Sequence, residues 1–94
     1  MTNKPLWELT FSKEAGKDLK KLDKPIQKRL ITYLKERVII SEDPRTLGKP
    51  LGHEMSHIWR YRVGDYRILC EIIDRTLCIE VVQAGHRKEI YDTH

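Results

Sequence analysis

The residue pair Gly64-Asp65 constrains this chain more than any other short stretch. It separates two segments rich in β-branched and aromatic residues, at positions 57–63 and 66–73. The pair suits a tight two-residue turn, because glycine adopts the positive φ that such turns require. The sequence therefore predicts a β-hairpin here, and the hairpin decides which side chains share a face of the sheet.

The predicted register separates two kinds of side chain, because alternate residues of a strand face opposite sides of a sheet. The apolar face carries Trp59, Tyr61, Val63, Tyr66, Ile68, Cys70 and Ile72. The other face carries Arg60, Arg62, Arg67, Leu69 and Glu71. Arg62 opposes Arg67, and directly opposed like charges destabilise a hairpin. Two interpretations stay open: a solvated face whose arginines splay or pair with Glu71 and Glu80, and an anion site, which the planar guanidinium suits.

Length and composition indicate one domain spanning residues 1–94. A hydrophobic content of 39% and a charged content of 34% suit a small domain with one buried layer. No run approaches the roughly 18 apolar residues of a membrane span, and no signal-peptide pattern begins the chain. We therefore expect a cytoplasmic protein without a membrane partner. Cys70 and Cys78 form no CxxC pair and are expected to be reduced thiols on opposite sheet faces. The net charge of +4 is compatible with a polyanionic partner.

Hydrophobic periodicity predicts the remaining elements. In chain order these are a strand at 7–11, a helix at 12–22, a helix at 25–38, a loop at 41–56, and strands at 57–63, 66–73 and 76–84. A turn and a short helical turn are expected to end the chain at 85–91. Each layer has an apolar face that needs cover, so we predict a two-layer α+β domain. A helical hairpin packs on a mainly antiparallel four-stranded sheet, in the order βααβββ.

The last strand has a less defined register, because its turn is weakly signalled. If Asp74-Arg75 forms that turn, Leu77, Ile79 and Val81 join the apolar face. Cys78, Glu80 and Val82 then join the arginine face, with Val82 beside Arg67.

The segment His53-Glu54-Met55-Ser56-His57 fits the H-E-x-x-H pattern of zinc proteases. That chemistry needs a stable helix that presents both imidazoles on one face. Glycine and proline precede the segment and a strand follows at once, so no room is left for a helix. We interpret the match as chance, with the histidines flanking the arginines as loop residues, and we predict no metal site.

The arginine face and the C-terminal segment together form a candidate site. Its predicted members are Arg60, Arg62, Arg67, His86, Arg87 and Tyr91. They include neither a carboxylate pair nor a set of metal ligands, so a metal-independent reaction on an RNA phosphodiester would suit them. RNA supplies its own nucleophile, the 2′-OH, while arginines stabilise the developing negative charge. His86 is the group whose ordinary pKa suits proton transfer near neutrality.

These motifs resemble those of the RelE/ParE superfamily of bacterial toxins. The resemblance rests on Leu51-Gly52, on the stretch 59–67, and on Gly85-His86-Arg87 followed by Tyr91. It implies a type II toxin–antitoxin module without a cofactor, whose partners are a cognate antitoxin, the ribosome and mRNA. The RelE branch of the superfamily cleaves mRNA in the ribosomal A site, whereas the ParE branch poisons DNA gyrase.

The resemblance also implies roles for individual residues. Arg67 matches the arginine that steadies the transition-state phosphate, Arg87 matches a proposed general acid, and Tyr91 matches a tyrosine that stacks on the substrate. Two active-site lysines of the family fall on Arg60 and Ile58. Arginine is a poor base. Either Arg60 acts electrostatically while His86 or a loop histidine takes the proton, or the chain is a weak nuclease.

Four residues are expected to bind RNA: Arg62 of the candidate site, and in addition Lys49, Lys88 and His57. Three functions remain as hypotheses: a ribosome-dependent mRNA endonuclease, a gyrase poison, and a nucleic-acid-binding homologue without activity.

Overall fold

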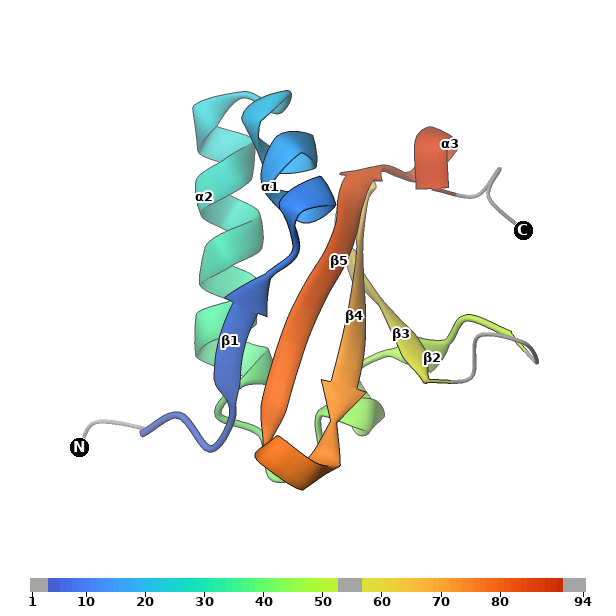
Figure 1. The fold of residues 1–94 in the computed structure, drawn as a ribbon. Coiled ribbons are helices and arrows are strands. Elements are labelled where there is room, and N and C mark those ends of the chain that lie inside the picture. The colour runs from blue at the N-terminus through green and yellow to red at the C-terminus, as the bar shows by residue number, and fades with distance from the viewer. Residues whose placement is uncertain (1–3, 53–56, 91–94) are drawn as a thin grey trace.

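The computed structural model describes residues 4–52 and 57–90 (Figure 1). Its elements, in chain order, are β1 (Glu8–Phe11), α1 (Lys13–Lys20), α2 (Lys24–Tyr33), the π-helical turn η1 (Leu34–Val38), the 3-10 turn η2 (Pro44–Leu47), β2 (Lys49–Pro50), β3 (Ile58–Val63), β4 (Tyr66–Ile73), the 3-10 turn η3 (Asp74–Thr76), β5 (Cys78–His86) and α3 (Arg87–Ile90). No helix in the described part of the chain is long and apolar enough to cross a membrane.

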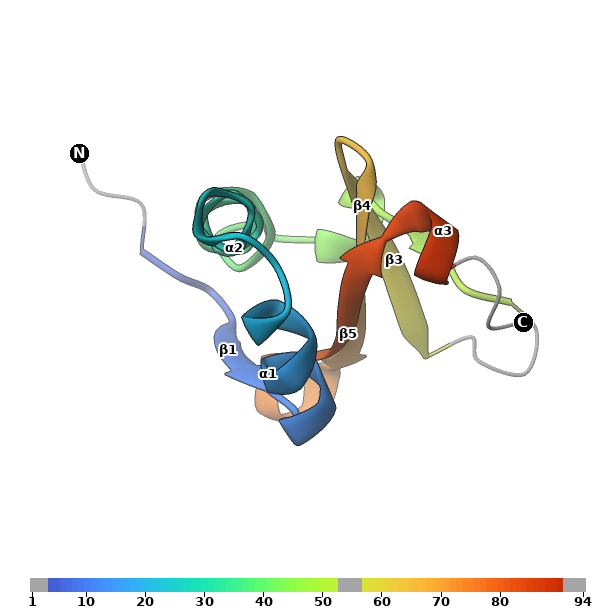
Figure 2. The same ribbon diagram turned by 90° about the horizontal axis from the view of Figure 1, so that it is seen from above.

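The strands form one sheet in the order β1-β5-β4-β3-β2. β1 runs parallel to β5, and every other neighbouring pair is antiparallel. Helices α1 and α2 cover one face of this sheet, as the view from above shows (Figure 2). The opposite face has no helical layer, and α3 lies at the end of β5 on the side away from α2 (Figures 1 and 2). The two-layer α+β prediction is confirmed at this level.

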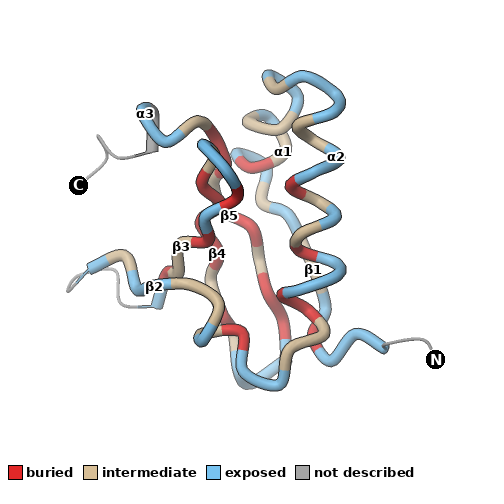
Figure 3. The backbone as a smooth tube through the Cα atoms, turned by 180° about the vertical axis from the view of Figure 1, so that it is seen from behind, coloured by how far each residue is buried: buried red, intermediate tan, exposed pale blue. Residues whose placement is uncertain are grey.

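The core lies between the two helices and the sheet, where the central strands β4 and β5 are mostly buried (Figure 3). Its largest fully buried side chains include Tyr61, Leu30, Leu34, Ile68, Ile79 and Val81. Ser12 begins α1 as a capping residue, because its hydroxyl accepts a hydrogen bond from the Ala15 N–H at 3.1 Å. Pro25 lies in the first turn of α2, where its missing N–H is not needed.

The β3–β4 hairpin has the predicted register. Arg62 pairs with Arg67 and Val63 with Tyr66, and Gly64 in the turn has a φ of +61°. Both cysteines are free, as predicted, and both are buried. Cys70 belongs to the core under the helices, whereas Cys78 lies on the other face, where its Sγ is 3.5 Å from the Thr10 hydroxyl.

The predicted sheet of four mainly antiparallel strands is wrong in two respects. The sheet has a fifth strand, β2, which lies inside the predicted loop 41–56 and pairs with Trp59 and Arg60 of β3. A two-residue strand that includes Pro50 has no periodicity to reveal it. The sheet is also mixed, because β1 runs parallel to its neighbour β5, a pairing that the sequence did not assign.

The same loop contains η2, which Asp43 begins by accepting a hydrogen bond from the Arg45 N–H. Tyr61 fixes η2 to the sheet, since its buried hydroxyl donates to the Pro44 carbonyl at 2.9 Å. The Arg45 guanidinium forms an ion pair with Asp74 in the turn between β4 and β5, where Nη2 lies 2.6 Å from Oδ2. This ion pair and its hydrogen bonds lower the pKa of the Asp74 carboxyl.

The predicted register of the last strand is also wrong. The turn spans Asp74 to Leu77 rather than two residues, and Leu77 ends it with a φ of +50° and with 54% of its surface exposed. Leu77 therefore does not join the apolar face, although Ile79 and Val81 do. An irregularity between Leu69 and Cys70 shifts the pairing further, so that Gly85 and not Val82 lies opposite Arg67.

Two glycines, Gly48 and Gly16, provide a matched test of how closely η2 packs against β3. A methyl group at Gly48 would lie 2.7 Å from the Arg60 carbonyl oxygen, whereas one at Gly16, inside α1, would meet nothing within 4 Å. We expect Gly48→Ala to lower the free energy of unfolding by about 1–3 kcal/mol. Gly16→Ala should raise it by about 0.5–1 kcal/mol. Urea titrations of both variants measure these changes, and a neutral Gly48→Ala would contradict the close contact between η2 and β3.

Candidate functional site

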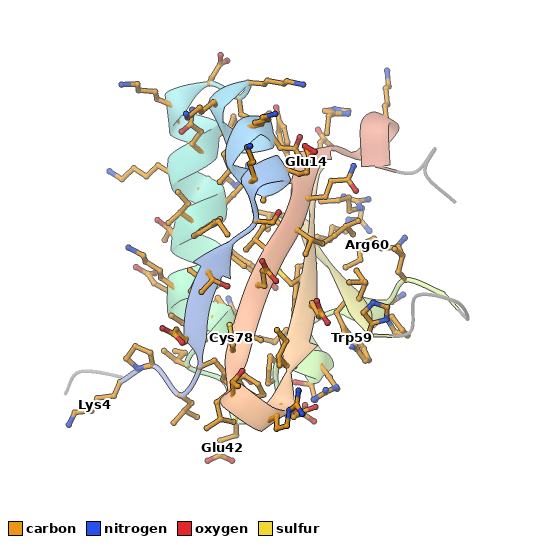
Figure 4. All side chains as sticks on the ribbon, in the orientation of Figure 1. Lys4, Glu14, Glu42, Trp59, Arg60 and Cys78 are labelled. Atoms are coloured by element: carbon orange, nitrogen blue, oxygen red, sulfur yellow. The ribbon has the colours of Figure 1, made fainter. Side chains whose placement is uncertain are left out.

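A basic hollow lies on the face of the sheet that α1 and α2 do not cover. It has a volume of about 320 Å³ and is lined by Thr46, Leu47, Gly48, Lys49, Arg60, Arg62 and Arg67. Strands β3 and β4 provide the arginines, and the segment from η2 to β2 provides the opposite wall. Figure 4 shows Arg60 extending from β3 on the side away from α2. None of the described residues that line the hollow is acidic.

Arg67 forms the floor of the basic hollow. Only 2% of its surface is exposed, although it is a charged residue. Its Nη1 donates to the Tyr66 carbonyl at 3.1 Å and to the Gly64 carbonyl at 3.4 Å. A buried charge needs such acceptors. The guanidinium is thus held in place by the tip of its own hairpin before any ligand arrives.

Three other cationic side chains, those of Lys49, Arg60 and Arg62, line the hollow together with Arg67. Arg62 lies directly opposite Arg67 and is exposed, whereas Arg60 is half-buried. Lys49 is the strand partner of Arg60 across the β2–β3 pair, so it faces the same side of the sheet. Positive charges gathered at a concave surface raise the local concentration of anions. The hollow is therefore suited to a phosphate group.

An apolar patch lies on the same face as the hollow. Ile58 and Leu69 are buried there, and the half-buried Leu51 and Val82 pack against them. Ile58 occupies one of the positions where the resemblance places a lysine. In this chain the position is part of a small second core instead.

His86 lies away from the hollow. It pairs with Tyr66 across β4 and β5, and the two rings meet edge to face with centroids 5.4 Å apart. Its Nδ1 accepts a hydrogen bond from the Lys88 N–H at 3.2 Å. A neutral imidazole that accepts at Nδ1 carries its proton on Nε2. The ring lone pair is therefore occupied by the backbone, and His86 faces the side of the sheet that Arg67 does not.

Arg87 begins α3 beside the hairpin tip. Its backbone N–H donates to the Asp65 carbonyl at 2.8 Å, and its side chain is exposed, as is that of Lys88. His57 is exposed at the start of β3 and does not line the hollow. Tyr91 lies outside the described residues, and so does most of the H-E-x-x-H segment. Among residues 4–52 and 57–90, no group of three or more metal-ligating side chains is present.

The structure thus brings together Arg60, Arg62, Arg67 and Lys49, and it does not bring His86 to them. The sequence did not indicate the wall formed by Thr46, Leu47 and Gly48. The available signal was the Asp43-Pro44 pair, a turn initiator followed within a few residues by glycine.

Comparison with known proteins finds similarity to toxins. Residues 9–91 match the family model described as the ParE toxin of the type II toxin–antitoxin system parDE. The curated toxin RelG of Mycobacterium tuberculosis is 29% identical over 85 residues, which cover 90% of this chain and 95% of that protein.

Two solved structures are similar over nearly the whole chain. One is the RelBE2 toxin–antitoxin complex of Mycobacterium tuberculosis, with a TM-score of 0.78 and 28% identity over 88% of this chain and 99% of that chain. The other is the RelB-RelE antitoxin–toxin complex of Methanococcus jannaschii, with a TM-score of 0.66 and 32% identity over 88% of this chain and 95% of that chain.

The opposed pair Arg62 and Arg67 is expected to reduce stability. Arg62→Thr removes the repulsion and introduces a residue that favours strands, so the free energy of unfolding should rise by about 0.2–1 kcal/mol. The gain should shrink as sodium chloride is added, because salt screens the charges. Arg75→Thr, in the turn η3 at the other end of β4, is the control and should not show this salt dependence. A loss of stability in Arg62→Thr would show that the pair is not repulsive.

Proposed function

This chain belongs to the RelE/ParE superfamily of toxins from type II toxin–antitoxin systems, and we propose that it is a metal-independent, ribosome-dependent mRNA endonuclease. The observation that supports this proposal is the basic hollow with the buried guanidinium of Arg67 at its floor. A site of this kind offers fixed positive charge to a phosphodiester and needs no metal to do so.

In the proposed reaction the 2′-oxygen of the message forms a bond to phosphorus while the bond from phosphorus to the 5′-oxygen breaks. Negative charge builds up on the phosphate oxygens in the transition state. Donors that are already oriented stabilise this charge most, because they need not reorganise. Arg67 fits that role, since two carbonyls hold its Nη1 in place. Arg60, Arg62 and Lys49 would bind the flanking RNA backbone.

The reaction also moves two protons, one away from the attacking 2′-OH and one onto the leaving 5′-oxygen. Arg60 keeps its proton and acts through its charge, so the proton of the 2′-OH passes to a solvent water molecule. Arg87, which starts α3 at the hairpin tip, would give a proton to the leaving 5′-oxygen. Lys88 and His57, both exposed, would bind RNA at the rim, and Tyr91 would stack on a base. The His86 side chain would support α3 through the Lys88 N–H rather than act as the base.

We also propose that a cognate antitoxin silences the chain by covering its positive face. The similar M. tuberculosis and M. jannaschii structures are both complexes of a toxin with an antitoxin. A segment that carries acidic side chains would neutralise the hollow and exclude RNA from it at the same time.

The proposal predicts that inducing this chain alone arrests growth and translation. Arg67→Ala and Arg87→Ala should relieve the arrest, with cleavage at least about 100-fold slower for Arg67→Ala. The matched control is Arg75→Ala, an exposed arginine in η3, which should remain toxic. Mapping of mRNA 5′ ends should show cuts within codons of translated messages. If both variants fold, as circular dichroism would report, and remain as toxic as the parent chain, the site assignment fails.

The name of the matching family model favours a second function, inhibition of DNA gyrase. The same induction experiment separates the two. Gyrase inhibition would leave messages intact and would produce stalled gyrase with a DNA-damage response. If neither cleaved messages nor stalled gyrase is found, the chain is a nucleic-acid-binding homologue without activity.

His86 provides a separate test of the proton route. His86→Asn keeps a side-chain acceptor for the Lys88 N–H, so cleavage should stay within about threefold of the parent. Removing a general base usually costs roughly 100-fold or more. A loss of that size in single-turnover cleavage, with α3 intact, would make His86 the base.

A further inference from the structure

The pairing of β5 with β4 changes by one residue at Val82. Cys70 pairs with Val81, but the preceding residue of β4, Leu69, pairs with Gln83. Val82 is therefore an extra residue without a partner on β4, which is a β-bulge. Bulges are frequent next to active sites, because a slip of one residue moves every following side chain to the opposite face of the sheet.

The bulge decides what lies opposite the floor of the basic hollow. With it, Gly85 pairs with Arg67, and the methyl group of Ala84 is buried in the core. Without it, Ala84 would pair with Arg67 and its side chain would face the hollow. The observed register places a residue without a side chain beside the buried guanidinium. It also turns His86 toward Tyr66.

Helix α1 and its capping residue hold the bulge from the edge of β5 that β1 leaves uncovered. The Ser12 N–H donates to the Val81 carbonyl at 2.8 Å, and the Ser12 hydroxyl donates to the Val82 carbonyl at 3.3 Å. The Ala84 N–H donates to Asp18 Oδ2 at 3.0 Å. Three backbone groups around the bulge thus find partners on Ser12 and α1 that the next strand would otherwise have to provide.

The bulge also affects the C-terminal arm, the segment from His86 to Lys88 at the end of β5 and the start of α3. After the bulge, β5 runs to His86, and the next backbone N–H, that of Arg87, donates to the Asp65 carbonyl in the hairpin turn. Asp18 is not among the residues that line the hollow. It nevertheless holds the segment that sets where Arg87 starts relative to Arg67.

We propose that Asp18, assisted by Ser12, is a positioning residue of the RNA-cleaving site and acts through the Val82 bulge. The inference rests on the proposed function, because it gives a role to an element outside the hollow. A residue with a purely structural role would lower global stability without changing the placement of Arg87. A positioning residue changes the rate of cleavage while the chain stays folded.

Four variants test this. Asp18→Ala removes the acceptor for the Ala84 N–H, and alanine does not weaken α1 itself. Asp18→Asn removes the charge but keeps a side-chain carbonyl that can accept. Asp23→Ala is the matched control, because Asp23 is an exposed aspartate whose side chain makes no capping hydrogen bond. Ser12→Ala removes the hydrogen bond to the Val82 carbonyl and so perturbs the same bulge independently of Asp18.

Two readouts are needed. Amide hydrogen exchange at Ala84 and Arg87, followed by NMR on the purified chain, reports the bulge and the arm. Cleavage of ribosome-bound mRNA gives kcat and KM. For Asp18→Ala we expect exchange at both amides to rise about fivefold or more. We also expect kcat to fall about tenfold or more with KM little changed. Asp18→Asn should restore the parent's exchange rates and its kcat, and Asp23→Ala should match the parent in both quantities.

Parent-like kcat in Asp18→Ala despite faster exchange at Ala84 would overturn the proposal, and so would a failure of Asp18→Asn to rescue. If the parent chain cuts no message, the proposed function fails, and exchange alone then decides the coupling. Faster exchange at Arg87 in Asp18→Ala would still support the link from α1 to the arm, and unchanged exchange there would refute it.

Discussion

The buried guanidinium of Arg67 needs acceptors, and the tip of the β3–β4 hairpin provides them. The Gly64 carbonyl is available because the turn adopts a positive φ at that residue, and the Tyr66 carbonyl belongs to the residue directly before Arg67. The same hairpin register places Arg62 opposite Arg67 and Arg60 along the same face. Functional sites often retain charge arrangements that reduce stability, and the opposed arginines are such an arrangement. The remainder of the sheet supports the hairpin from both edges.

The hairpin and its two faces could be predicted because period-two alternation and one turn pair define them. Arg60, Arg62 and Arg67 were found on one face for that reason, and Tyr61, Ile68 and Ile72 in the core for the same reason. The helices were also predictable, since Leu30, Leu34 and Val38 recur at helical spacing and are buried. Local sequence carries this information because each pattern is complete within a few residues.

The last strand was mispredicted because its register depends on partners far away in the sequence. The bulge at Val82 forms hydrogen bonds with Ser12 and Asp18, about 70 residues earlier, and nothing near Val82 signals it. The sequence placed His86 in a turn beside the arginines, whereas in the structure β5 continues to His86, which pairs with Tyr66. A slip of one residue moved His86 to the opposite face. The short strand β2 was missed for a related reason, since Lys49 and Pro50 form a strand only because β3 lies beside them.

If the basic hollow accelerates attack by a 2′-OH of the message, removing that hydroxyl should abolish cleavage. Single-turnover cleavage of a ribosome-bound mRNA with one 2′-deoxynucleotide on the 5′ side of the cut bond measures this. We expect the parent chain to cut the all-ribose message, to leave a 2′,3′-cyclic phosphate, and not to cut the substituted message at that bond. Equal cleavage of both messages would contradict this mechanism, because the nucleophile would then come from elsewhere.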